Sequence, residues 1–176
     1  MSNNYLQSAI KQFEYYKSLG DKTFAQLSPE KMLWQYNDDS NSIAIIINHL
    51  HGNMLSRWTD FLTTDGEKDS RNRDTEFESA VTSKDDLLKR WEAGWQCLFD
   101  ALHSISDADL DKEILIRNQK HTIAEAINRQ LAHYPYHIGQ IVFLGKMLSD
   151  NNWVSLSIPK GKSDAFNADM FSNPKK

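Results

Sequence analysis

Apolar side chains recur at steps of three and four residues along the segment from Thr122 to Ser149. That spacing places them on one face of an α-helix. The segment opens with a T-x-x-E sequence, Thr122 to Glu125, which is typical of a capping box at a helix start. The apolar face consists of Ile123, Ile127, Leu131, Tyr134, Ile138, Ile141 and Val142. A helix of this kind must bury its apolar face against other elements, so a helical domain is expected.

Three further segments have the same helical spacing: residues 5–27, residues 43 to about 63, and residues 83 to about 102. Ser42 and Ser83 precede the last two of these and are expected N-caps, because a serine oxygen can accept a free backbone N–H at a helix start. The isoleucine-rich residues 43–47 are also compatible with a strand. The apolar period continues to Phe61, however, and therefore favours a helix.

The remaining segments are interpreted as connections. Ser28-Pro29 begins a short helical turn, and residues 64–82, with a mixed charge run from residue 67 to 73, form a long solvent-exposed loop. Residues 114–120 form a brief extended arm and turn, and the tail from Asn151 has no helical period. Pro135 lies inside the last helix and should kink it, because proline has no N–H for Leu131; a helix end at Tyr134 is the alternative.

The predicted fold is therefore all-α. We expect a four-helix bundle in a single domain over residues 1–176, with a non-helical C-terminal tail, about residues 151–176, packed on or beside it.

Composition and charge argue against several classes of function. The net charge is −4 and the sequence pI is about 5.8, with scattered lysines and arginines, so no nucleic-acid partner is expected. The longest apolar run, residues 43–47, is too short to cross a membrane, and residues 1–5 lack the features of a signal peptide. A single cysteine, Cys97, excludes an intrachain disulfide and fits a cytoplasmic protein. We interpret Cys97 as a packing residue, not a nucleophile.

His133 and His137 are spaced i and i+4 in the last predicted helix, so both rings project from one face. Two such imidazoles can bind one metal ion, although the same spacing also occurs at helix surfaces without a metal. A site would need a third ligand, and His49 in the helix that begins at residue 43 offers one. The histidines without a partner at a useful spacing are His51, His103 and His121.

Three stretches carry a family resemblance: Ser42-Ile43 with Asn48-His49-Leu50, the run from His133 to Ile141 (HYPYHIGQI), and Leu156-Ser157-Ile158-Pro159-Lys160-Gly161. With these residues the chain resembles the DinB/YfiT-like superfamily of metal-dependent enzymes over nearly its whole length, most closely a bacterial subgroup classed as a domain of unknown function. The resemblance implies a four-helix bundle, a homodimer, and a divalent metal ion bound by three histidines, which here would be His49, His133 and His137. Pro135 departs from the wider pattern of the superfamily. Some members are thiol S-transferases, which implies a low-molecular-weight thiol as substrate.

The chemistry of three imidazoles agrees with this expectation. They suit Zn²⁺ or Ni²⁺ and leave at least one position open for water or substrate. Because bound water has a lowered pKa and a bound thiol is deprotonated, hydrolysis and thiolate transfer are the two reactions to expect. Asn53, Arg57 and Arg129 are candidates to orient a ligand or anchor an anionic group, and Gln140 is a more distant one. Each of these can equally be an ordinary polar residue of a helix face.

Three functions remain open at this point. The first is a metal-dependent enzyme for a small molecule, of thiol S-transferase or hydrolase type. The second is a non-catalytic metal- or small-molecule-binding protein of the stress or sensor kind. The third is a purely structural helical bundle. No glutamate lies between or beside the histidine pair as in H-E-x-x-H helices, which argues against protease chemistry and leaves the general base unidentified.

Overall fold

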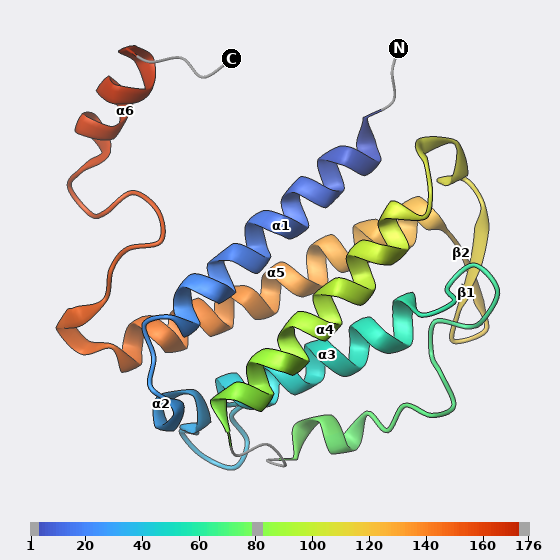
Figure 1. The fold of residues 1–176 in the computed structure, drawn as a ribbon, viewed down its shortest axis with the longest axis horizontal. Coiled ribbons are helices and arrows are strands. Elements are labelled where there is room, and N and C mark those ends of the chain that lie inside the picture. The colour runs from blue at the N-terminus through green and yellow to red at the C-terminus, as the bar shows by residue number, and fades with distance from the viewer. Residues whose placement is uncertain (1–3, 79–82, 173–176) are drawn as a thin grey trace.

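Four long helices form the body of the computed structural model, which describes residues 4–78 and 83–172 (Figure 1). They are α1 (Tyr5–Phe24), α3 (Ile43–Trp58), α4 (Lys84–His103) and α5 (Ile123–Leu148). Helix α3 packs against α4 and α5, and α1 packs against α5 and α4. The all-α prediction is confirmed. None of the helices in the described ranges is long and apolar enough to cross a membrane.

Short elements connect these helices. Helix α2 (Pro29–Leu33) follows α1, and three short 3-10 turns, η1 (Asp74–Phe77), η2 (Asp107–Asp109) and η3 (Asp150–Asn152), lie in the connections. Strands β1 (Glu113–Ile116) and β2 (Gln119–Thr122) form one antiparallel hairpin, and α6 (Ser163–Ser172) ends the described chain. Residues 1–3, residues 79–82 of the predicted loop and residues 173–176 of the predicted tail lie outside the described residues.

The predicted helix starts are confirmed by their capping contacts. The Oγ of Ser42 accepts a hydrogen bond from the backbone N of Ile45 at 3.2 Å, and the Oγ of Ser83 accepts one from Asp86 at 3.1 Å. Thr122 and Glu125 form the reciprocal capping box that begins α5. Each contact satisfies a backbone donor that the helix itself leaves free.

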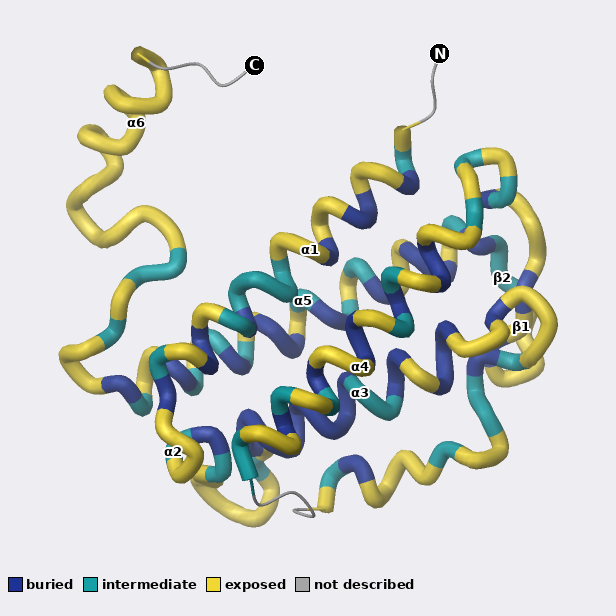
Figure 2. Tube along the Cα trace, in the orientation of Figure 1, coloured by how far each residue is buried: buried dark blue, intermediate teal, exposed yellow. Residues whose placement is uncertain are grey.

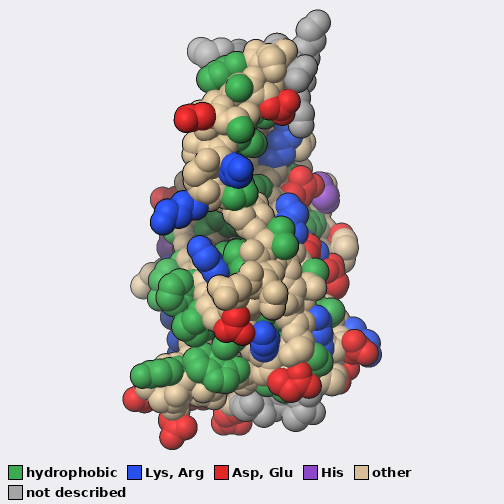
Figure 3. Space-filling view, turned by 90° about the vertical axis from the view of Figure 1, so that its left-hand side faces the viewer, with side chains coloured by type: hydrophobic (Ala, Val, Ile, Leu, Met, Phe, Trp, Pro, Cys, Tyr) green, Lys and Arg blue, Asp and Glu red, His purple; other side chains and the backbone are tan. Residues whose placement is uncertain are grey.

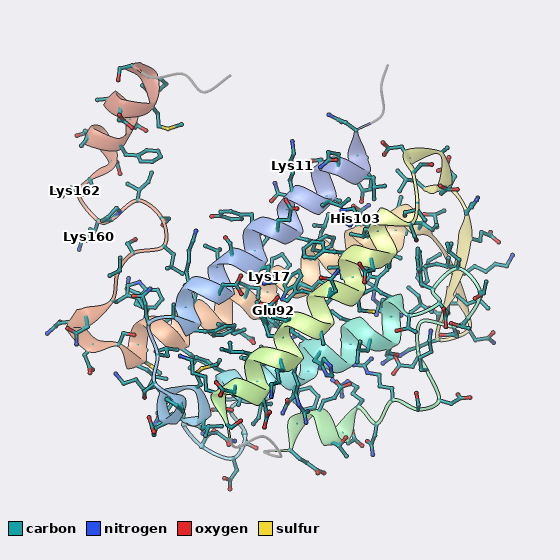
Figure 4. The ribbon with its side chains drawn as sticks, viewed as in Figure 1. Lys11, Lys17, Glu92, His103, Lys160 and Lys162 are labelled. Carbon is teal, nitrogen blue, oxygen red and sulfur yellow. The ribbon has the colours of Figure 1, made fainter. Side chains whose placement is uncertain are left out.

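The buried faces of the four helices meet in one core (Figure 2). Its centre is aromatic: the rings of Phe13, Trp95 and Tyr134 contact one another across α1, α4 and α5. The hydroxyl of Tyr134 accepts a hydrogen bond from Trp58 and donates one to Asn53, each at 3.1 Å. These two bonds fix α5 against α3 and satisfy a fully buried hydroxyl. Away from the core, Lys17 on α1 lies 2.8 Å from Glu92 on α4 (Figure 4).

Two helices end earlier than predicted, α1 at Phe24 instead of residue 27 and α3 before residue 63. Helix α3 ends at Trp58 and does not continue to residue 63, because Asp60 has a φ of 47° and its carbonyl accepts the N–H groups of Thr63 and Thr64 in a turn. Helix α5 is continuous from residue 123 to 148, so the alternative that it ends at Tyr134 is wrong. Packing on both sides of Pro135 maintains the helix across the missing hydrogen bond.

The extended arm and turn predicted for residues 114–120 is the β1–β2 hairpin. Its two-residue turn, Arg117-Asn118, has φ values of 54° and 57°, which are those of a type I′ turn. The carboxylate of Asp65 accepts both backbone N–H groups of this turn, at 2.8 and 2.7 Å. The hairpin is thereby tied to the long connection between α3 and α4.

The tail was predicted to be non-helical, and this is wrong for residues 163–172, which form α6. Gln26 holds the start of the tail through two hydrogen bonds with the backbone of Val154, at 2.8 and 3.2 Å. Beyond this point the chain leaves the body of the molecule, and every residue of α6 is exposed (Figures 1 and 2). The space-filling view shows apolar side chains on the surface of this segment (Figure 3). The exposed apolar residues of α6 include Phe166 and Phe171.

Candidate metal centre

His49 on α3 and His133 and His137 on α5 point their rings at one another. The Nε2 atom of His133 lies 3.2 Å from Nε2 of His49 and 3.1 Å from Nε2 of His137. The ligand atoms of all three side chains lie within 4.8 Å of one another. The i,i+4 spacing on α5 and the packing of α3 against α5 produce this convergence. The three residues named as metal ligands from the sequence are therefore brought together.

The opposite nitrogen of each ring is held by an oxygen atom. The Nδ1 of His49 lies 2.9 Å from Oε2 of Glu76. The Nδ1 atoms of His133 and His137 each lie 3.1 Å from a glutamine oxygen, of Gln130 and Gln140 respectively. An oxygen at this position accepts the Nδ1 proton, so the neutral ring leaves Nε2 with its lone pair.

Three Nε2 lone pairs that face one another fit a cation between them. Bonds of about 2.0–2.1 Å from zinc to imidazole nitrogen, at tetrahedral angles, separate two ligand nitrogens by about 3.4 Å. The two closest Nε2 separations, 3.2 and 3.1 Å, are near this value. Oxygen partners on the outer ring nitrogens are also typical of metal-binding histidines. The donor set and its spacing therefore fit a divalent ion.

The imidazoles of His133 and His137 are neutral at physiological pH. Burial, together with the neighbouring imidazoles, lowers the pKa of His133 to about 3, and burial lowers that of His137 to about 4. A charged ring would lose its hydration at these positions and would face other positive groups. Because only the neutral ring offers a lone pair, these two rings can bind a metal ion without first releasing a proton.

Glu76 is part of the site and was not identified from the sequence. It lies in η1, and its side chain is 8% exposed, so the prediction of a solvated loop is wrong here. Arg71, 5% exposed, contacts both carboxylate oxygens, through Nε at 2.7 Å and Nη2 at 2.9 Å. Although burial disfavours the charge, the hydrogen bonds from His49 and Arg71 hold the pKa of Glu76 below its usual value. Glu76 is therefore a carboxylate that fixes the ring of His49.

The close approach of η1 to α3 requires a small residue. A Cβ on Gly52, three residues after His49, would lie 2.2 Å from Oε1 of Glu76. A glycine inside a helix normally lowers helix stability, so Gly52 is the signal that could have indicated a close neighbour. Nothing in the periodicity of residues 64–78 distinguishes Glu76 from the exposed charges around it.

A cavity of about 450 Å³ opens beside the three histidines. Asn53, Arg57 and Arg129, the candidates for ligand binding, all line it. Asn53 also accepts the hydrogen bond from Tyr134 and so has a role in packing. Gln140, the more distant candidate, holds the ring of His137. The three histidines set aside in the sequence, His51, His103 and His121, are outside the cluster.

Comparison with known proteins gives a family but no activity. A family model described as "Protein of unknown function (DUF1572)" matches residues 1–162. The search of curated proteins found no match. The search of solved structures found none either.

Proposed function

We propose that this chain, which belongs to the DUF1572 family, binds one divalent metal ion through His49, His133 and His137 and is a metal-dependent enzyme for a small molecule. One observation carries the proposal: three Nε2 atoms converge while every Nδ1 is held by an oxygen. That arrangement uses both nitrogens of each ring, whereas histidines at a helix edge without a function have no reason to converge. Zn²⁺ or Ni²⁺ is the ion we expect, since imidazole suits both.

The contacts of Glu76 favour thiol S-transfer over hydrolysis. When bound by three imidazoles, such an ion acts as a Lewis acid that lowers the pKa of a water molecule toward 7 and deprotonates a thiol outright. Among the described residues, Glu76 is the one carboxylate that contacts any of the three histidines, and its two oxygens are occupied by His49 and Arg71. It is therefore not free to act as a general base. Thiol S-transfer with a low-molecular-weight thiol, which needs no such base, takes precedence over hydrolysis.

The proposal extends to the wider family and its assembly. Four long helices that carry the histidines on α3 and α5 support assignment to the DinB/YfiT-like superfamily and its four-helix bundle. A homodimer and a cytoplasmic location are further parts of the proposal. Size-exclusion chromatography with light scattering measures the first of these, and a monomer at micromolar concentration would contradict it.

A non-catalytic metal- or small-molecule-binding protein of the stress or sensor kind is the second candidate. The occupied carboxylate of Glu76 favours it, because the same geometry that fixes His49 removes the nearest proton acceptor. Such a protein would hold the metal and a ligand without turnover.

Two measurements test the proposal. Elemental analysis of freshly purified protein should give one divalent ion per chain, and a protein that neither contains nor takes up Zn²⁺ or Ni²⁺ would refute it. The metal-loaded and the chelated protein are then compared in conjugation assays with small thiols and a panel of electrophiles. Turnover only in the metal-loaded protein supports the enzyme, and stoichiometric metal with no turnover of thiols or hydrolysable esters supports the binding protein.

A further inference from the structure

We propose that the cavity beside the three histidines binds the anionic oxygen group of a small molecule, a phosphate or a carboxylate, through Arg57 and Arg129. This inference rests on the proposed function only in taking the cavity as the substrate site. It adds the chemical class of the ligand, which the three histidines by themselves do not specify.

The burial of Arg57 and its lack of hydrogen-bond partners within the described chain point to a ligand. The side chain of Arg57 is 3% exposed, lies in the wall of the cavity, and has no hydrogen-bond partner within the described residues for Nε or Nη1. Its nearest carboxylate oxygen, on Glu67, is 4.0 Å from Nη2. Burial lowers the pKa of Arg57, but a guanidinium remains charged in proteins. A buried charge without good partners is costly, and an anion bound in the adjoining cavity would offset that charge.

The other charged residues of the lining are all arginines. Beside Arg57, the cavity is lined by Arg71, Arg73, Arg117 and Arg129, and no aspartate or glutamate is among its lining residues in the described chain. The carboxylates in contact with these arginines are shared: Glu67 lies 3.2 Å from both Arg71 and Arg117, and Glu76 is bound by Arg71. Glu67 and Glu76 are thus the two carboxylates that pair with these arginines, so the wall of the cavity keeps a net positive charge. Field lines concentrated in such a cavity favour anions.

The position of the two proposed contacts relative to the histidines is set by their helices. Arg129 precedes His133 by four residues on α5, so the two side chains leave the same face of the helix. Arg57 follows His49 by two turns on α3. Arg129 is exposed at the cavity and has no ion pair within the described residues. An anion held between Arg57 and Arg129 would therefore place the rest of the molecule beside the imidazoles.

Guanidinium groups suit this ligand class because their planar N–H donors match the oxygens of phosphate and carboxylate in pairs. The cavity volume of about 450 Å³ lies in the range that small-molecule sites occupy. A small phosphorylated or dicarboxylated molecule fits both properties.

The test is calorimetric titration of inorganic phosphate and of succinate at constant ionic strength, in the zinc-loaded and the chelated protein. We expect saturable binding of at least one of the two anions, with the preferred anion identifying the phosphate or the carboxylate class. Arg57→Gln and Arg129→Gln should each lower its affinity by tenfold or more. Arg90→Gln is the matched control, since Arg90 lines a different cavity and contacts Asn48 at 3.2 Å.

The outcomes separate this inference from the proposed function. Equal affinities in the Arg57, Arg129 and Arg90 variants, or no saturable binding of either anion, would overturn the anion site. If Arg57→Gln does not fold, Arg129→Gln still decides, because its side chain is exposed. Zinc uptake is measured in the same variants and should equal that of the unaltered protein. Normal zinc uptake with no anion binding in the unaltered protein refutes the inference alone, and anion binding without zinc uptake refutes the proposed function alone.

Discussion

The Nδ1 of His49 and Oε2 of Glu76 lie 2.9 Å apart although 27 residues separate them in the chain. Both side chains are less than a tenth exposed. Arg71 holds the carboxylate from the other side, so His49, Glu76 and Arg71 form a continuous chain of hydrogen bonds. These hydrogen bonds fix the ring of His49, which is the one imidazole of the three that does not come from α5. The connection between α3 and α4 is therefore part of the candidate site.

We expect Glu76→Gln to weaken metal binding. The amide keeps the shape of the side chain but loses the charge that supports the Nδ1 proton of His49, and loss of such an outer partner costs about 10- to 100-fold in metal affinity. Competition with a chromogenic zinc chelator measures the change. Glu78→Gln is the control, because Glu78 is exposed in the same segment. Equal zinc affinity of the two variants would show that Glu76 does not support the site.

His133→Ala should abolish stoichiometric metal binding, because Nε2 of His133 is within 3.2 Å of both other Nε2 atoms. Two imidazoles that remain hold a divalent ion far less tightly than three. Equilibrium dialysis against micromolar zinc followed by elemental analysis gives the stoichiometry. His103→Ala removes a histidine at the C-terminal end of α4, away from the cluster, and should retain one ion per chain (Figure 4). A full complement of zinc in the His133 variant would contradict the three-histidine site.

Alanine substitution of two helix glycines, Gly20 at the contact of α1 with α4 and Gly139 at an open position of α5, tests how closely α1 packs against α4. A Cβ on Gly20 would lie 2.5 Å from Cζ2 of the Trp91 ring, which is 2% exposed and cannot move aside easily. Gly20→Ala should therefore destabilise the protein by about 1–3 kcal/mol, the usual cost of overpacking a core. Gly139→Ala adds a Cβ with nothing within 4 Å and should stabilise α5 by about 0.5–1 kcal/mol. Urea unfolding of both variants measures the difference, and effects of the same sign would contradict it.

Cys97 should react slowly with alkylating agents at neutral pH. Burial raises the pKa of its thiol, which outweighs the hydrogen-bond contact with Thr59. Because the thiolate is the reactive form, a raised pKa moves the midpoint of the rate above the usual value of about 8.5. The rate with iodoacetamide, followed by mass spectrometry from pH 7 to 10, gives the midpoint in the native protein. The protein unfolded in urea is the control, and a native midpoint at or below the unfolded one would be inconsistent with a packing role.

Removal of residues 163–176 should leave both stability and metal binding unchanged. Every described residue of α6 is exposed, and Gln26 binds the tail well before α6, at the backbone of Val154. Thermal unfolding and zinc stoichiometry of the shortened protein provide the measurement. Gln26→Ala should have a larger effect on the tail, seen as faster proteolysis after residue 154. A fall in the unfolding temperature of several degrees on truncation would show that α6 stabilises the fold.

The sequence by itself determined the long helices and which two of them, α3 and α5, carry the three histidines. Periodicity and capping are local properties, so Ser42, Ser83 and the Thr122–Glu125 box indicated the helix starts that the structure has. The i,i+4 spacing of His133 and His137 likewise fixed their common face before any tertiary contact was known. The ends of α3 and of the tail were less well predicted, since a left-handed Asp60 and an isolated α6 leave no periodic signal.

Only the tertiary structure decided what surrounds the histidines. Glu76 and Arg71 lie in a polar connection with no period, and their burial depends on η1 packing against α3 at Gly52. The cavity and its arginines likewise come from α3, α5, the β1–β2 hairpin and the α3–α4 connection together. A charge that is solvated and a charge that is buried and paired look the same in sequence. Their difference is a long-range contact, which local residue patterns do not encode.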